Sequence, residues 1–289
     1  MSNQRFEKLT NTLQNVLATE VMYKKVSKLN MTTADAFLCG SGNVKTTIYF
    51  DPEWDDDVIV HRVARIWREQ DPNVADLESI FVSRLNDRDY VLEHVERSVI
   101  GTKLNEEMLE RCVNRKYLDL SVIYKVIVGR SSGGRATTTV TKELAEALNL
   151  TLEDLETASM KNQGVDDFVT ASVHKILVES GQIPEELTEF ADDEFYPMYV
   201  ISTKDGMNGA ASILHTSLFA GLADTLKSDL YILPSSIFEL ICVPDQGQPA
   251  GFFREMVAAV NHDVVAANEV LCNSVYKYKR KTGVISIAE

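Results

Sequence analysis

Residues 117–128 form the segment that most strongly constrains the fold of this chain. The segment is apolar almost throughout, and residues that favour strands occupy both its odd and its even positions. Apolar side chains on both faces are typical of a strand at the centre of a sheet that is covered on both sides. The sequence therefore predicts a central strand, built on Leu118, Leu120, Val122, Ile123, Val126, Ile127 and Val128.

The residues before this strand predict a helix, a small meander of strands and two further helices. Apolar residues at helical spacing give the first helix one stripe that faces a core. From Val21 the apolar period changes to two, which indicates strands. The expected elements are a helix with Phe6, Leu9, Leu13, Val16 and Leu17 on its stripe, strands at 21–29, 34–39 and 44–50, a helix after Pro52 with Ile59, Val63, Ile66 and Trp67 on one face, and a helix at 74–85.

The residues after the central strand alternate between strand and helix patterns. Thr151 and Asp154 have the spacing of a capping box, which predicts that a helix begins there. The expected elements are a turn at 130–134, a strand at 135–141, helices at 142–150, from 151 and at 165–178, an exposed acidic connector at 185–194, strands at 231–233 and 237–243, a helix from Ala250 with Phe252, Phe253, Met256, Val257 and Val260 on its stripe, and a hairpin of 275–280 with 284–287.

These patterns predict an α+β fold of mainly antiparallel sheets with packed helices. They also suggest two α+β regions, an N-terminal one at 1–94 and a C-terminal one at 95–289. Within the second region, residues 124–155 align without a gap with residues 199–230, and each copy is interpreted as strand, turn, strand and helix. The identical positions are Tyr124/Tyr199, Gly134/Gly209, Ala136/Ala211, Thr141/Thr216, Ala145/Ala220, Asp154/Asp229 and Leu155/Leu230.

Acidic residues outnumber basic ones, and the formal net charge is −14. A surface of this sign repels phosphates, so direct binding to nucleic acid or to an anionic membrane is disfavoured and a protein partner with a basic surface is favoured. The acidic clusters lack the alternating spacing and the glycine of an EF-hand loop, so no metal is predicted. The candidate docking residues are Asp55, Asp56 and Asp57, at an expected helix start, and Asp192, Asp193 and Glu194, in the expected connector.

The cysteines and the hydropathy pattern restrict the cellular compartment that we expect for this protein. Cys39, Cys112, Cys242 and Cys272 are far apart in sequence, so zinc or redox spacing is lacking and buried thiols are expected. No apolar run approaches the roughly 20 residues of a membrane-spanning helix. We expect a cytoplasmic protein that carries no cofactor.

Two glycine motifs resemble catalytic or nucleotide loops without meeting their requirements. Gly129–Gly133 matches G-x-S-x-G, but a β-branched run follows it instead of the helix that a nucleophile elbow needs. Gly40–Lys45 lacks the third glycine of a dinucleotide loop and the Gly-Lys of a P-loop. His215, next to Thr216 at the end of an expected strand, is interpreted as a structural histidine.

Residues 233–239, Leu-Pro-Ser-Ser-Ile-Phe-Glu, are the most unusual stretch of the chain. A junction between two strands at this position can aim Ser235, Ser236 and Glu239 at a ligand. Equally, the serines can satisfy backbone groups of a turn. Asn208 and Gly209, in the turn of the second copy, complete the set of ligand or partner candidates.

Four segments together resemble a known family: 117–124, 198–200, 208–211 and 226–239. The family consists of uncharacterised proteins, widespread in anaerobic gut bacteria and often encoded on mobile genetic elements, and it is described as a domain of unknown function. The resemblance covers most of the chain and implies no activity, substrate or cofactor. The family usually has a histidine before the glutamate of the Pro-Ser-Ser stretch, where this chain has Phe238, which further disfavours an enzyme.

The preferred hypothesis is a non-enzymatic acidic protein that binds a macromolecular partner. In its specific form it is an accessory or inhibitor protein of a mobile element, which occupies a basic, nucleic-acid-binding surface of another protein. The first alternative is a small-ligand-binding protein or hydrolase-like enzyme with its site near 234–239 and the turns at Gly134 and Gly209. The second alternative is a structural or oligomeric component with an exposed apolar patch on the helix that contains 252–260.

Overall fold

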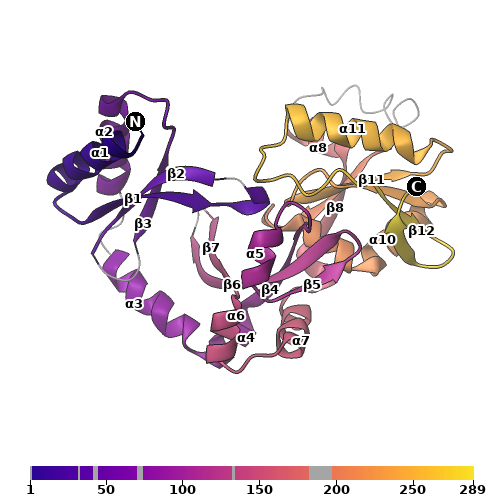
Figure 1. Cartoon of the computed structure of the whole chain (residues 1–289). Helices are drawn as coiled ribbons and strands as arrows, with labels where there is room; N and C mark the ends of the chain where they lie inside the picture. Colours follow the sequence, from indigo (N-terminus) through magenta and orange to yellow (C-terminus); the bar gives the residue numbers. More distant parts are fainter. Residues whose placement is uncertain (1, 32, 42–44, 70–73, 132–133, 182–196) are drawn as a thin grey trace. The chain divides into compact units, whose positions relative to one another are not determined.

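The computed structural model describes residues 2–31, 33–41, 45–69, 74–131, 134–181 and 197–289. Contacts divide the chain into two compact units, Met1–Asp87 and Arg88–Glu289, which we call the N-terminal and C-terminal units (Figure 1). The predicted boundary between the two regions lies after residue 94. The contacts divide it before the short helix α4 (Arg88–His94), which packs on elements of the C-terminal unit.

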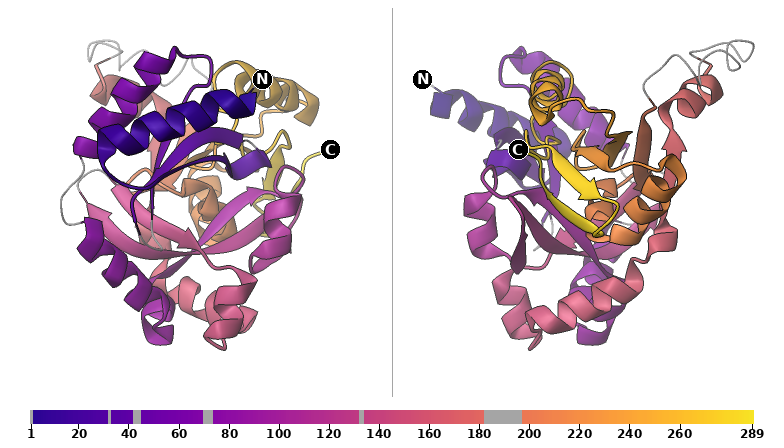
Figure 2. Two further views of the ribbon diagram at one scale, coloured as in Figure 1. Left: turned by 60° about the vertical axis from the view of Figure 1, so that its left-hand side comes forward. Right: turned by 90° about the vertical axis from the view of Figure 1, so that its right-hand side faces the viewer.

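The N-terminal unit consists of a three-stranded antiparallel meander with helices packed on it. The strands lie in the order β1-β2-β3, with Val21 opposite Cys39 and Cys39 opposite Thr46. Figure 2 shows the helix α1, in indigo, lying across these strands. The elements are α1 (Ser2–Leu17), β1 (Val21–Ser27), η1 (Leu29–Met31), β2 (Thr33–Cys39), β3 (Thr46–Phe50), α2 (Asp56–Arg68) and α3 (Val74–Leu85).

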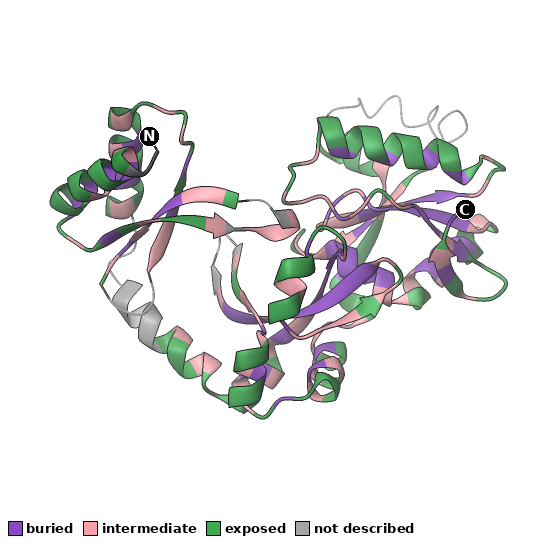
Figure 3. Ribbon diagram, in the orientation of Figure 1, coloured by how far each residue is buried: buried purple, intermediate pink, exposed green. Residues whose placement is uncertain are grey.

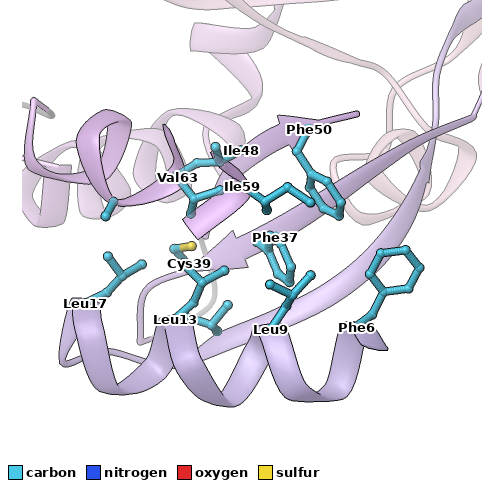
Figure 4. Packing of buried hydrophobic residues seen from close by; sticks show 12 residues of the cluster. Phe6, Leu9, Leu13, Leu17, Phe37, Cys39, Ile48, Phe50, Ile59 and Val63 are labelled. Atoms are coloured by element: carbon cyan, nitrogen blue, oxygen red, sulfur yellow. The ribbon is translucent and has the colours of Figure 1, made fainter. Parts of the chain in front are cut away.

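The core of the N-terminal unit lies between this meander and the first two helices. Leu9 and Leu13 of α1 are buried and point towards Phe37 of β2 (Figure 4). Full burial of such a side chain contributes about 1.5–3 kcal/mol to folding. The predicted stripe of α1 is confirmed except at Val16, which is 42% exposed because it lies at the edge of the stripe.

The C-terminal unit begins with a sheet built around the predicted central strand. β6 lies in the middle, with β4 along one side and β5 and β7 along the other, all antiparallel. Residues 120–124 and 126–128 are buried, so the prediction of a doubly covered strand is confirmed over 120–128. It is wrong at 117–119, because β5 ends at Tyr117 and Leu118 lies in a turn with φ of 56°. The elements are β4 (Val95–Gly101), α5 (Glu106–Arg111), β5 (Asn114–Tyr117), β6 (Leu120–Ser131), β7 (Gly134–Thr139), α6 (Lys142–Ala147) and α7 (Leu152–Asn162).

Side-chain alternation in this sheet creates two different faces. Successive residues of a strand point to opposite faces, so Tyr124 and Lys125 of β6 face opposite ways. Arg97 of β4 lies opposite Tyr124, and Glu96 lies opposite Lys125. Helix α7 packs on the face that carries Arg97 and Tyr124. The capping box predicted for this helix, formed by Thr151 and Asp154, is confirmed. We call the opposite face of this sheet, which carries Lys125 and Glu96, the Lys125 face.

A six-stranded antiparallel sheet forms the rest of the C-terminal unit, in the order β13-β12-β10-β11-β9-β8. The predicted last hairpin is confirmed, because β12 pairs with β13 (yellow in the right view of Figure 2). The elements are β8 (Phe168–Ser172), β9 (Tyr199–Thr203), η4 (Gly209–Leu214), α10 (Thr216–Leu226), β10 (Leu230–Leu233), β11 (Glu239–Pro244), α11 (Ala250–Asp263), β12 (Tyr276–Lys279) and β13 (Val284–Ile287).

The predicted helix at 165–178 is wrong over 165–172 and confirmed over 173–178. The structure has a short 3-10 turn, η2 (Val165–Asp167), then the edge strand β8, and only then the helix α8 (Val173–Glu179). Helix α8 begins after Ser172, whose hydroxyl accepts a hydrogen bond from a backbone N–H of the first turn. The helical spacing at 165–173 has no buried face behind it, since Val169 is 44% exposed.

The predicted duplication is also wrong in its second copy. Residues 209–214 form the 3-10 helix η4 instead of a strand. One reason is that β9 is already paired with β8 on one side and β11 on the other, which leaves no edge for a hairpin partner. Another is that residues 209–213 are all buried, which a strand with one solvent face does not allow.

Helix α11 buries only part of its predicted apolar stripe. Phe253 and Val257 are buried against β10 and its neighbours, whereas Phe252, Met256 and Val260 are 52%, 40% and 40% exposed. Figure 3 shows this division along the helix. Among the residues that the structure describes, no helix has the length and apolarity needed to cross a bilayer.

Candidate functional site

The candidates at 235–239 form the turn that joins β10 to β11. The Ser235 hydroxyl donates to Glu239 Oε1 at 3.2 Å. The hydroxyl of Ser236, a buried residue, accepts from the backbone N–H of Phe238 at 3.0 Å. The two serines thus bond to groups of their own turn, in the way that hydroxyls stabilise local backbone structure.

Asn208 and Gly209 join this turn to strand β4. Asn208 has a left-handed backbone with φ of 64°, and its Nδ2 donates to the Arg97 carbonyl oxygen at 2.6 Å. Gly209 lies so close to the turn that a Cβ atom would be 2.0 Å from the carbonyl oxygen of Phe238. The structure therefore brings Asn208 and Gly209 against the 235–239 turn, through Phe238 and not through the serines.

A small cavity lies where these segments meet the Lys125 face. Its volume is about 90 Å³. Strands β4, β6 and β7 contribute its floor, and the segments before η4 and β11 contribute its sides. The lining residues are Glu96, Ser98, Lys125, Ile127, Arg135, Thr137, Met207, Asn208, Ile237 and Phe238. Of the sequence-predicted candidates, only Asn208 lines this cavity, which we call the Lys125 pocket.

Arg135 of the Lys125 pocket is neutralised by two carboxylates. Its Nη1 lies 2.6 Å from Glu96 Oε2, and it also donates to Asp205. Burial alone would raise the pKa of Asp205, but the hydrogen bond from Thr203 and the charge of Arg135 outweigh it and lower that pKa. Both carboxylates are thus already bonded to Arg135, and the lowered pKa of Asp205 keeps that group ionised at neutral pH.

Lys125 is the remaining charged group of the pocket. Within the described part of the chain, its ammonium makes no hydrogen bond and no ion pair. Burial without a compensating partner lowers the pKa of Lys125, because a charged ammonium is poorly solvated there. By contrast, Lys277 lies 2.5 Å from Asp245, and its pKa is raised by that hydrogen bond.

The opposite face of the same sheet carries a cluster of polar side chains around the half-buried Glu156 of α7. Arg115 binds this carboxylate with two hydrogen bonds, of 3.1 and 2.9 Å, and the Tyr124 hydroxyl donates a third. Arg97, which is only 3% exposed, places Nη1 3.9 Å from Glu156 Oε1. Arg97 Nε has no hydrogen-bond partner among the described residues, but Glu156 balances the charge of this buried guanidinium, and we assign the cluster to stability.

His215 extends the cluster as a neutral acceptor. Arg97 Nη2 lies 2.8 Å from His215 Nε2 and can only donate, so the imidazole must carry its proton on Nδ1. Burial, followed by the charge of Arg97, lowers the pKa of His215 to about 4. This contact agrees with the interpretation of His215 as a structural histidine.

The acidic docking candidates lie in the N-terminal unit or outside the described residues. Asp55 and Asp57 are exposed at the start of α2, whereas Asp56 accepts from Arg5 at 2.7 Å. Asp192, Asp193 and Glu194 lie outside the described residues. In the part of the chain that the structure describes, no group of three or more His, Cys, Asp or Glu side chains is arranged to hold a metal ion.

The charged residues of the Lys125 pocket are not among the candidates that the sequence predicts. A signal for one of them was present, because Lys125 is the single charged residue of the apolar stretch 120–128. Burial of an isolated charge is costly, so such a residue in a central strand marks a site. Glu96 and Arg135 gave no comparable signal, since they lie in short polar stretches far away in sequence.

Comparison with known families gives one match that spans nearly the whole chain. A model described as "Family of unknown function (DUF5688)" matches residues 3–280. Neither the curated proteins nor the solved structures contain a significant match.

Proposed function

Because the chain belongs to the DUF5688 family of unknown function, we propose from the geometry alone that its C-terminal unit binds a small polar organic molecule. In this proposal a carboxylate or carbonyl oxygen of the ligand accepts a hydrogen bond from Lys125. The observation that carries it is the Lys125 ammonium, which lines a cavity without a partner among the described residues. Lys125 is half-buried, and a charge that is partly removed from water is costly unless a bound group compensates it.

Size and charge define the ligand class further. The small volume, about 90 Å³, favours a ligand as small as lactate or pyruvate over a nucleotide. The nearby charges, two carboxylates on Glu96 and Asp205 and two cations on Arg135 and Lys125, sum to zero. This balance favours a singly charged or neutral ligand over a phosphate.

We expect that replacing Lys125 weakens lactate binding. Lys125→Met removes a charged donor whose hydrogen bond contributes about 1.5 kcal/mol, so the affinity should fall about tenfold. Lys116→Met is the matched control, because Lys116 is an exposed lysine of the neighbouring strand β5. NMR titrations of the full-length protein and of each variant with lactate measure the two affinities. Equal affinities for the two variants, or no binding by the unmodified protein, would contradict the proposal.

A second proposed function is the binding of a protein partner with a basic surface. It is supported by the net charge of −14 and by Asp55 and Asp57, which are exposed at the start of α2. Negative potential steers basic partners and makes association sensitive to salt. An accessory or inhibitory role on a mobile genetic element of gut bacteria is the specific form of this proposal.

Two triple variants that remove equal charge test this second function. If 55–57 are the docking residues, Asp55→Asn/Asp56→Asn/Asp57→Asn should weaken binding to polylysine about fivefold. The exposed Asp55 and Asp57 each contribute an ion pair of about 0.5 kcal/mol, whereas Asp56 is already paired with Arg5. The control is Glu106→Asn/Glu107→Asn/Glu110→Asn on α5, where all three side chains are exposed. Equal weakening in both variants would show that only net charge matters, which excludes docking at 55–57.

A further inference from the structure

We infer that Lys125 is a carbonyl-capturing residue, whose side-chain nitrogen condenses with an aldehyde or ketone bound in the Lys125 pocket to form an imine. The inference rests on the proposed ligand site and deepens it, because it names both the reacting atom and the substrate class. Small carbonyl compounds, including 2-oxo acids, are the expected substrates.

The position of Lys125 suits a nucleophile. It lies on β6, the central strand of its sheet, which is hydrogen-bonded to β4 on one side and β7 on the other along this stretch. Its side chain lines the pocket, and in the described part of the chain no carboxylate holds the nitrogen in an ion pair. A lysine nitrogen that is desolvated and unpaired attacks carbonyl carbon more readily than an ion-paired one.

The other lining groups suit a carbonyl oxygen and its reaction. Ser98 and Thr137, which carry hydroxyl groups, line the pocket, and Asn208 is a further polar lining residue. Hydroxyls can donate to the oxygen on which negative charge develops as the nitrogen attacks. Burial lowers the pKa of Lys125, which increases the fraction of neutral amine at pH 7.

The chemical step is balanced without a further reactant. The nitrogen lone pair attacks the carbonyl carbon, a C–N bond forms, and the C=O π electrons move to oxygen. Proton transfer from nitrogen to oxygen gives a carbinolamine. Loss of that oxygen as water leaves the C=N bond, so one amine and one carbonyl give one imine and one water, with no oxidation or reduction.

Reductive trapping tests the inference on the full-length protein. The protein is incubated at pH 7 with pyruvate or propanal and cyanoborohydride, and the modified lysines are mapped by peptide mass spectrometry. We expect labelling of Lys125, a desolvated amine that lines the pocket, to exceed that of the exposed Lys116 by about tenfold. Lys125→Arg should lose this adduct without greater labelling elsewhere, because a guanidinium forms no imine under these conditions.

Lactate distinguishes failure of the carbonyl capture from failure of the proposed ligand site. It carries a hydroxyl in place of the carbonyl of pyruvate, so it can bind in the site but cannot form an imine. Binding of lactate by the protein and by Lys125→Arg, together with labelling of Lys125 no faster than that of Lys116, would overturn the carbonyl capture and leave the ligand site in place. Lack of lactate binding with no preferential labelling would overturn both.

Discussion

Replacement of Glu156 by Gln is expected to destabilise the C-terminal unit by about 3 kcal/mol, which for a unit of this size lowers Tm by roughly 6–12 °C. The carboxylate accepts two hydrogen bonds from Arg115 and one from Tyr124. It is also the counter-ion of Arg97, whose side chain is 4% exposed. Without it, a buried guanidinium loses its compensating charge, and this loss dominates the effect.

Urea unfolding of the full-length protein, followed by circular dichroism, measures this change. The matched control is Glu107→Gln, because Glu107 pairs with Arg111 at 2.7 Å on the exposed surface of α5 and should cost no more than about 0.5 kcal/mol. Tyr124→Phe, which removes one donor and keeps the charge pairs, should cost about 1 kcal/mol. A Glu156→Gln midpoint equal to that of Glu107→Gln would refute a stabilising role for the cluster.

The sequence was informative where a local pattern decides the structure. The doubly apolar stretch at 120–128 identified the central strand, and Thr151 with Asp154 identified a helix start, because both signals arise from residues adjacent in the chain. Local patterns failed at 165–172, where helical spacing occurs in a segment whose fold is decided by pairing of β8 with β9.

The two polar clusters could not be predicted from the sequence because tertiary pairing creates them. Glu96 and Arg135 meet only because β4 and β7 flank β6, and Glu156 reaches Arg97 only through packing of α7. Side-chain alternation then decides which charges share a face. The hydroxyls at 235–236, by contrast, were predicted as site groups from composition alone. The structure shows that they are hydrogen-bonded within their own turn.

Replacement of Gly209 by Ala is expected to destabilise the C-terminal unit by about 3 kcal/mol, through steric overlap that η4 cannot relieve. The new Cβ would lie 2.0 Å from the Phe238 carbonyl oxygen and 2.7 Å from Ser202 Cα, both of them backbone atoms. Relief would require η4 to move away from β9 and β11, and the Asn208 contact with Arg97 would move with it.

Gly221→Ala in α10 is the control for this change, because a Cβ there meets no atom within 4 Å. Gly221 lies in a helix, where alanine is favoured over glycine by about 0.8–1.0 kcal/mol, so this variant should be slightly more stable. Urea midpoints of the two full-length variants therefore move in opposite directions. A Gly209→Ala midpoint equal to that of the unmodified protein would show that η4 has room to shift, and that Gly209 is not required for its packing against the 235–239 turn.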